Sequence, residues 1–223
     1  MIRRLLAEAA GTFLLAFAVG ACNSEPFAVG GSLWAAMIFT GFASGAQFNP
    51  GVSVALIIYK ALSRTLNKES LVELLLNIVV QIIFALLGAL LAGSIVKYVS
   101  YFDVAEGYIA SEAFFAEMVY TAVLTGDAIM VGQLTNSNLI GGGVVAMSVA
   151  AGNWAIGKIT GGCFNPAIGF AINITNYAMN NDHFENTWIY IFAPLLGAII
   201  GSLLAFVFAS ELKGQRASME AKQ

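Results

Sequence analysis

Six long apolar runs constrain this chain more than any other feature of its sequence. Each is close to the ~20 residues that a helix needs to cross the ~30 Å hydrocarbon core of a bilayer. Of the 223 residues, 59% are hydrophobic and only 10% are charged, which is more apolar surface than a soluble domain could bury. The sequence therefore predicts an all-α membrane protein with six transmembrane helices, at residues 5–22, 29–45, 71–96, 113–131, 139–157 and 187–209.

Two shorter apolar stretches, residues 49–59 and 165–174, are long enough for only half of the bilayer, and both open with Asn-Pro. Asparagine is a strong helix N-cap, and proline suits the first helical position because an N–H there would have no partner. One interpretation is two turns in ordinary loops. We instead predict two re-entrant half-helices, whose positive dipole ends point at the middle of the bilayer and disfavour cations there.

The sequence also repeats itself. Residues 8–12 are echoed by residues 117–121, and residues 44–51 by residues 160–167. Each half then holds three spans and one half-helix, and because three is odd, the second half must be upside down relative to the first. We expect a single domain over residues 1–223, an inverted repeat with halves at about 1–100 and 105–223. Its two Asn-Pro loops should meet near the membrane centre.

The positive charges indicate the orientation of the chain. With the N-terminus inside the cell, most Lys and Arg residues are cytoplasmic, whereas only Lys97 and Lys158 lie outside. Both termini are therefore expected on the cytoplasmic side. The expected location is the plasma membrane. A net charge of -3 with no basic stripe gives no sign of nucleic-acid binding. The expected cytoplasmic charges are Arg3, Arg4, Lys60, Arg64, Lys68, Lys213, Arg216 and Lys222.

These motifs resemble those of the aquaporin, or major intrinsic protein, family over nearly the whole chain. The resemblance is carried by Glu8 with Thr12, residues 44–51, Glu117 with Thr121, and residues 161–167. It implies a homotetramer in the lipid bilayer, with one pore in each subunit and neither a cofactor nor a metal ion. It also implies that Asn49 and Asn165 donate N–H groups to small neutral solutes in single file, while loop carbonyl groups accept. The pore motifs are Asn49, Pro50 and Gly51, and Asn165, Pro166 and Ala167.

Two glutamates, Glu8 and Glu117, lie inside predicted spans, where a charge is costly. A catalytic pair is one hypothesis, but an intramembrane hydrolase also needs a nucleophile with a base, or a metal site. The sole histidine, His183, falls in an external loop, where we expect it to be solvated; an external pH sensor is the alternative. The family resemblance implies instead that the glutamates hold the re-entrant loops by accepting backbone hydrogen bonds.

The largest departure from the family pattern is Ile168, three residues after the second motif asparagine, where the family typically has an arginine. Counting from the motif asparagines places the other selectivity-filter positions at Val29, Asn153 and Gly162. These four positions carry neither the aromatic residue and histidine typical of strict water pores nor the aromatic residue and arginine typical of glycerol pores. The filter is therefore expected to be wide and mostly apolar. Gly51, where alanine is usual, is expected to have a small effect.

A passive channel for water or small neutral solutes, such as glycerol, urea or ammonia, fits these features best. A non-conducting structural or adhesion protein of the same fold is the main rival. An ion-permeable channel is a third hypothesis, because Ile168 removes a positive barrier, and an enzyme ranks last. Cys163 lies two residues before Asn165, where it is either a possible site of mercurial block or a cysteine packed behind the loop.

Overall fold

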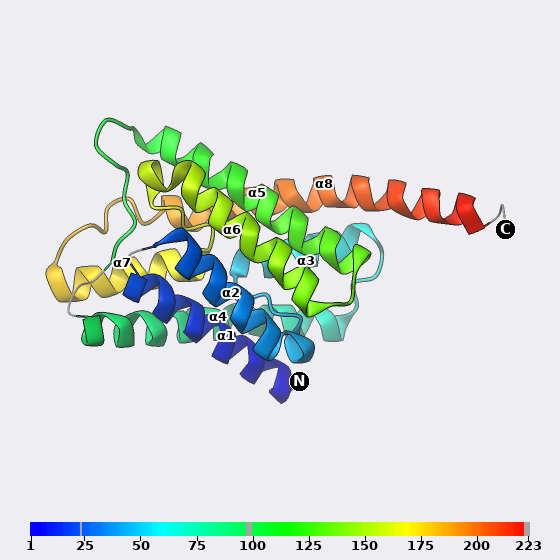
Figure 1. The fold of residues 1–223 in the computed structure, drawn as a ribbon, viewed down its shortest axis with the longest axis horizontal. Coiled ribbons are helices and arrows are strands. Elements are labelled where there is room, and N and C mark those ends of the chain that lie inside the picture. Colours follow the sequence, from blue (N-terminus) through cyan, green and yellow to red (C-terminus); the bar gives the residue numbers. More distant parts are fainter. Residues whose placement is uncertain (23, 97–99, 221–223) are drawn as a thin grey trace.

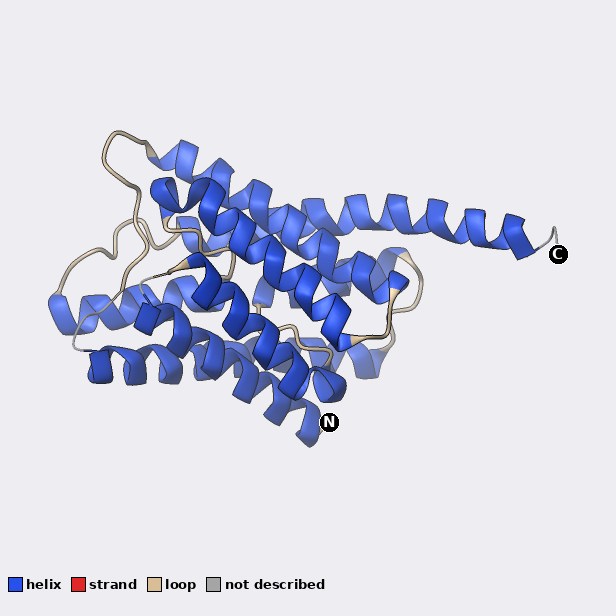
Figure 2. Cartoon of the chain, viewed as in Figure 1, coloured by secondary structure: helices blue, strands red, loops and turns tan. Residues whose placement is uncertain are grey.

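The computed structural model describes residues 1–22, 24–96 and 100–220. Within these ranges the regular structure is entirely helical (Figure 2). Lys97 and Lys222, two of the charges behind the predicted orientation, lie outside the described residues. The helices are α1 (Ile2–Cys22), α2 (Pro26–Ser44), α3 (Pro50–Leu62), α4 (Lys68–Val96), α5 (Ala110–Leu134), α6 (Asn138–Thr160), α7 (Pro166–Asn180) and α8 (Ile189–Glu220).

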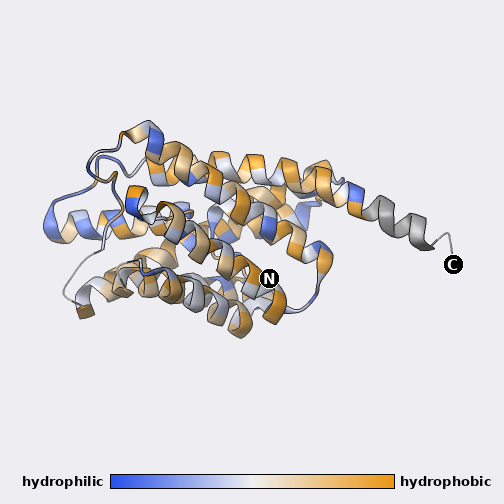
Figure 3. Ribbon diagram, turned by 45° about the horizontal axis from the view of Figure 1, so that its top comes forward, coloured by the Kyte–Doolittle hydropathy of each residue, from blue (hydrophilic) through white to orange (hydrophobic). Residues whose placement is uncertain are grey.

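Six of the described helices are long and apolar enough to cross a membrane, as the sequence predicts. They are α1, α2, α4, α5, α6 and the Ile189–Leu212 part of α8. Figure 3 shows apolar residues spread along the sides of the bundle, where a soluble protein would be polar. The observed bounds differ most from the predicted ones in α8, which continues to Glu220 although its apolar run ends at residue 209. Helix-forming residues such as Glu and Lys extend the helix beyond the apolar run.

The two half-helices, α3 and α7, each begin directly after a motif asparagine. Asn49 and Asn165 have extended backbones and act as N-caps, and a proline occupies the first helical position after each. In Figure 1 both chain termini lie at one end of the bundle, which we call the near end; α3 extends toward it and α7 toward the opposite, far end. The half-helices therefore start close together and diverge.

Helix α7 runs to Asn180, past the end predicted at residue 174. Asn173 and Asn176 do not stop the helix, because both are buried and bonded to neighbouring loops. Asn173 donates to the carbonyl oxygen of Phe102 and Asn176 to that of Asp182. These bonds explain why the polar end of the stretch stays helical.

The two halves of the chain pack in the same way. Helix α1 lies against α4, and α5 lies against α8. A Cβ atom at Gly88 of α4 would lie 2.5 Å from the carbonyl oxygen of Phe13, and one at Gly197 of α8 would meet that of Met118. Small residues permit close helix crossings in membranes, and at these two positions only glycine avoids a clash with the facing backbone. Matched glycines at matched crossings agree with an inverted repeat.

Candidate functional site

Two loops of matched backbone conformation lead into the half-helices. Helices α2 and α6 end at Gly45 and Gly161, whose left-handed φ angles of 86° and 85° suit glycine. Phe48 and Phe164, each directly before a motif asparagine, are also left-handed, with φ of 49° and 53°. A phenylalanine keeps this conformation only where its surroundings enforce it.

Glu8 of α1 supports the first loop from behind and is fully buried. Its carboxylate accepts hydrogen bonds from the backbone N–H groups of Gln47 and Phe48, both at 2.9 Å. The side-chain amide of Gln81 donates a third bond, at 2.8 Å. A carboxylate offers only acceptors, so these donors compensate for its burial. The sequence does not single out Gln81, because only the packing of α4 on α1 brings it there.

Glu117 of α5 holds the second loop in the same way. It accepts from the backbone N–H groups of Cys163 at 3.0 Å and Phe164 at 2.8 Å. Its third donor is the hydroxyl of Thr160, at 2.6 Å. Each loop is thus tied to one buried acid on its rear side, which leaves its other side available to line a cavity.

Asn49 and Asn165 join the two loops to each other. The amide nitrogen of Asn49 donates to the carbonyl oxygen of Phe164, and that of Asn165 to the carbonyl oxygen of Phe48, both at 2.9 Å. The amide oxygen of each accepts a first-turn N–H group of its own half-helix, at 2.7 Å and 3.1 Å. An amide carries two N–H bonds, so each asparagine keeps one donor beyond this contact.

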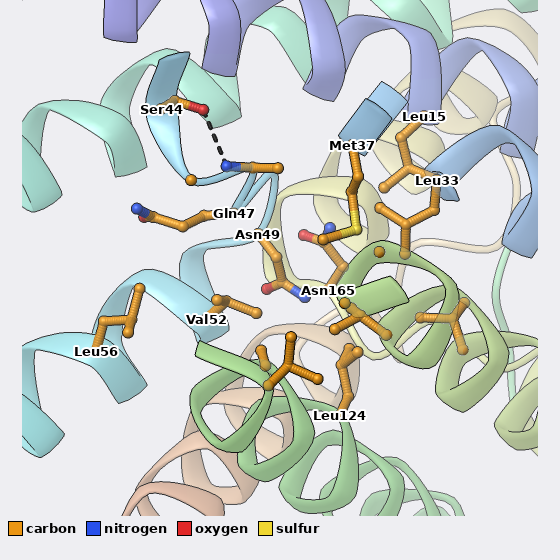
Figure 4. Close-up of a pocket in the computed structure, with 18 of the residues that line it drawn as sticks. Leu15, Leu33, Met37, Ser44, Gln47, Asn49, Val52, Leu56, Leu124 and Asn165 are labelled. Carbon is orange, nitrogen blue, oxygen red and sulfur yellow. Dashed lines mark hydrogen bonds between the residues drawn. The ribbon is translucent and has the colours of Figure 1, made fainter. Parts of the chain in front are cut away.

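A cavity of about 490 Å³ passes these asparagines inside the single chain (Figure 4). In Figure 4, Asn49 and Asn165 lie between Gln47 and Leu56 on one side and Leu33 on the other. Much of the wall is aliphatic, as in many small-molecule sites, with few polar groups to orient a solute. The aliphatic lining residues of the long helices include Leu15, Val19, Val29, Leu33, Met37, Leu124, Ala128, Val131, Val145 and Val149.

The cavity reaches both ends of the bundle. At the near end it is lined by Arg4, Lys60 and Glu73, and Arg4 forms an exposed ion pair with Glu73 at 2.7 Å. At the far end it is lined by Ser24 and Phe102, from the loops that follow α1 and α4. The lining therefore has the layout of a pore with a charged mouth at one end.

Three of the four predicted filter residues, Val29, Gly162 and Ile168, lie on this cavity wall. Asn153 is not among the described lining residues, so its place in the filter stays a prediction. Its amide nitrogen donates to the carbonyl oxygen of Val149 at 3.2 Å. Its amide oxygen lies 2.8 Å from where a Cβ atom at Gly162 would be. Asn153 thus lies against Gly162, a contact that counting along the sequence could not give.

At the far end, the loops after α4 and α7 meet around His183. Its ring stacks on Tyr101 with 3.7 Å between the ring centroids, and its nitrogens contact Asp103 at 2.7 Å and Asp182 at 3.2 Å. His183 is thus less solvated than expected, with 31% of its side chain exposed. Burial raises the pKa of Asp103, but hydrogen bonds from Asn186 and His183 outweigh burial and hold that pKa below its usual value.

Comparison with known proteins decides the family. The sequence model of the major intrinsic protein family matches residues 1–205. The chain belongs to this family. It is 27% identical to a probable aquaporin, NIP7-1, of Arabidopsis thaliana, over 91% of this chain and 75% of the relative. It is also 27% identical to glycerol uptake facilitator protein-like 6 of Lactiplantibacillus plantarum, over 94% of this chain and all of the relative (100%).

The fold agrees with that of a solved member of the major intrinsic protein family. The aquaglyceroporin from Plasmodium falciparum superposes with a TM-score of 0.74, over 92% of this chain and 95% of that chain, at 16% sequence identity. At Gly51, which differs from the usual family motif, the Cβ atom of an alanine would lie 3.0 Å from the amide oxygen of Asn49, a tight contact that only a small shift of Asn49 would relieve. Ile168 is the departure that bears directly on the cavity wall.

Proposed function

We propose that this chain is a passive membrane channel for water and small neutral solutes, with a pore inside each subunit. The observation that carries the proposal is the cavity that reaches both ends of one chain and passes the two asparagine-capped half-helices. The names of its relatives, an aquaporin and a glycerol uptake facilitator, support the same class of function. The free N–H bonds of Asn49 and Asn165 would orient a polar solute in an otherwise apolar wall.

The filter is proposed to discriminate by size and charge in an unusual way. Val29, Gly162 and Ile168 contribute no charge and no side-chain donor to the wall. The electrostatic barrier to cations and protons then rests mainly on the positive ends of the half-helix dipoles. Solutes larger than water, such as glycerol or urea, should pass, and proton exclusion should be less secure than with an arginine. An apolar wall also slows water by dewetting, so a high water rate is not expected.

The surroundings of the pore are proposed from the family resemblance and the charge pattern. Four chains form a homotetramer in the plasma membrane, each with its own pore. Both termini, and hence the near end with Arg4, Lys60 and Glu73, face the cytoplasm. Residues 1–223 act as one channel domain whose halves, about 1–100 and 105–223, are related by the inverted repeat.

Reconstitution of the purified chain into liposomes tests the proposal. Stopped-flow light scattering should show faster water, glycerol, urea or ammonia flux than in protein-free liposomes of the same lipid, with an ion-flux assay as control. Selective ion flux would favour the ion-channel hypothesis instead. No flux of any solute by folded protein would favour a structural or adhesion role.

Replacing Asn49 or Asn165 by aspartate is expected to reduce solute flux several-fold. Aspartate still caps the half-helix, but its carboxylate cannot donate to the facing carbonyl oxygen, a loss of about 1–3 kcal/mol for a buried pair. Proteoliposome flux and thermal stability measure the effect, with Asn67→Asp, an exposed cap outside the described cavity lining, as the control. Unchanged folding and solute profile in both variants would contradict a pore at the asparagines.

Mercurials are expected to block most of the flux by reacting with Cys163, which lines the cavity next to Asn165. Cys22 is half-buried against the core and is not among the described lining residues. Cys163→Ser should therefore abolish the block, whereas Cys22→Ser should leave it intact. Equal mercury sensitivity of the parent and Cys163→Ser would mean that Cys163 is inaccessible from the pore.

A further inference from the structure

We propose that Phe102, from the loop between α4 and α5, sets the upper size limit for solutes at the far end of the pore. The inference rests on the proposed channel function and adds a specificity-determining residue to it. The filter positions on the helices and the second re-entrant loop supply only small or aliphatic side chains, namely Val29, Gly162 and Ile168. A size limit at this end must therefore come from another element.

Phe102 is the one aromatic side chain among the described residues that line the cavity. It shares the far part of the wall with Val19, Ser24 and Gly162. Only 2% of the residue is exposed, so its ring lies within the bundle and not on the surface of the loop. A bulky, flat and uncharged group at this place narrows the opening without adding a charge.

The ring of Phe102 rests on two fixed neighbours. Gly161 has no side chain, and a Cβ atom there would lie 2.8 Å from the ring. Tyr190 also lies against the ring, with 5.5 Å between the ring centroids. Tyr190 is itself fully buried and donates its hydroxyl to the carbonyl oxygen of Thr160 at 2.8 Å. The ring therefore has little room to move away from a passing solute.

The backbone of Phe102 is held equally firmly. The side chain of Asn173 accepts the N–H group of Phe102 at 2.8 Å and donates to its carbonyl oxygen at 2.9 Å. The same amide nitrogen also donates to the hydroxyl of Thr187 at 3.0 Å, which fixes its orientation. Asn173 is buried, so both backbone bonds are protected from water.

The residues on either side of Phe102 are also anchored. Before it, Ser100 donates its hydroxyl to the carbonyl oxygen of Gly20 at 3.1 Å. After it, Asp103 accepts from the amide of Asn186 at 2.7 Å. A loop residue fixed on both sides can serve as a rigid part of the pore wall, as residues on helices do elsewhere in the filter.

Size-graded polyols provide the test, with glycerol, erythritol and ribitol taken up by proteoliposomes that contain the full chain. Phe102→Ala should raise uptake of the larger polyols relative to glycerol by roughly tenfold, the scale of a steric fit. Phe102→Trp should lower the size limit below that of the parent. Tyr108→Ala, an aromatic deletion in the same loop outside the described lining, is the matched control and should leave the polyol ratios unchanged.

If Phe102→Ala does not fold, Phe102→Leu and Phe102→Trp decide the question, because both keep a large apolar side chain against Gly161 and Tyr190. Folded variants that conduct glycerol with the parent's polyol ratios would overturn the role of Phe102 and leave the channel function standing. A folded parent that conducts no solute would overturn the channel function and this inference together.

Discussion

Replacing Glu117 by alanine is expected to destabilise the protein by roughly 3 to 9 kcal/mol, because three buried donors lose their acceptor at about 1–3 kcal/mol each. These donors are the backbone N–H groups of Cys163 and Phe164 and the hydroxyl of Thr160. The loss also removes the support for the left-handed backbone of Phe164. Since folded proteins are typically stable by only ~5–15 kcal/mol, this loss is a large fraction of the total and should lower both the melting temperature and the yield of folded protein.

Size-exclusion chromatography in detergent and the melting temperature measure this effect. The matched control is Glu112→Ala, on the same helix, which removes a single exposed hydrogen bond to the N–H group of Ile109. Its cost should be about 1 kcal/mol or less. If Glu117→Ala folds and melts like the parent, the second loop does not depend on this carboxylate.

Replacing Ile168 by arginine is expected to lower the uptake of glycerol and urea by at least about tenfold, the scale of steric discrimination by one side chain. Ile168 is 2% exposed and lies on the cavity wall, so a longer side chain there must occupy the pore. The guanidinium also adds a permanent positive charge and five donors at the filter. Proton leak should therefore fall in the same vesicles.

Ile168→Met separates the two effects, because methionine lengthens the side chain without adding a charge. It should reduce uptake of the larger solutes while leaving the proton leak near that of the parent. Solute uptake and proton flux are measured on the same vesicle preparation. An arginine variant that changes neither quantity would show that Ile168 does not line the narrow part of the pore.

Local signals in the sequence predicted much of the fold. The apolar runs give the six membrane-crossing helices, because a span must satisfy its backbone internally and face lipid along its length. The Asn-Pro pairs give the starts of α3 and α7, because capping depends on a few adjacent residues. The end of α7 was less predictable, since Asn173 is bonded to a loop 71 residues away in the sequence and Asn176 to the loop that follows the helix.

The details of the candidate pore depend on contacts that no local pattern reveals. Asn153, a predicted filter residue, donates its amide N–H to the carbonyl oxygen of Val149, and its amide oxygen lies against Gly162. Gln81 reaches Glu8 only through the packing of α4 on α1. Such positions follow from the way the helices and loops pack together and not from spacing along the chain.

Phe102 is the clearest example of a position that the sequence alone could not predict. It belongs to a loop whose course is fixed by Asn173, on a helix many residues away. Nothing in the composition or spacing of that loop indicates that one of its side chains lines the cavity. The sequence therefore predicted a wide apolar filter, whereas the structure adds an aromatic ring to its far end.

The temperature dependence of urea and glycerol uptake by the parent protein tests the central claim most directly. Flux through a preformed pore crosses no lipid, so proteoliposomes should take up solute faster than protein-free liposomes, with a shallower dependence on temperature. The contradicting result is that proteoliposomes with folded protein take up both solutes no faster than protein-free liposomes, and with the same steep temperature dependence.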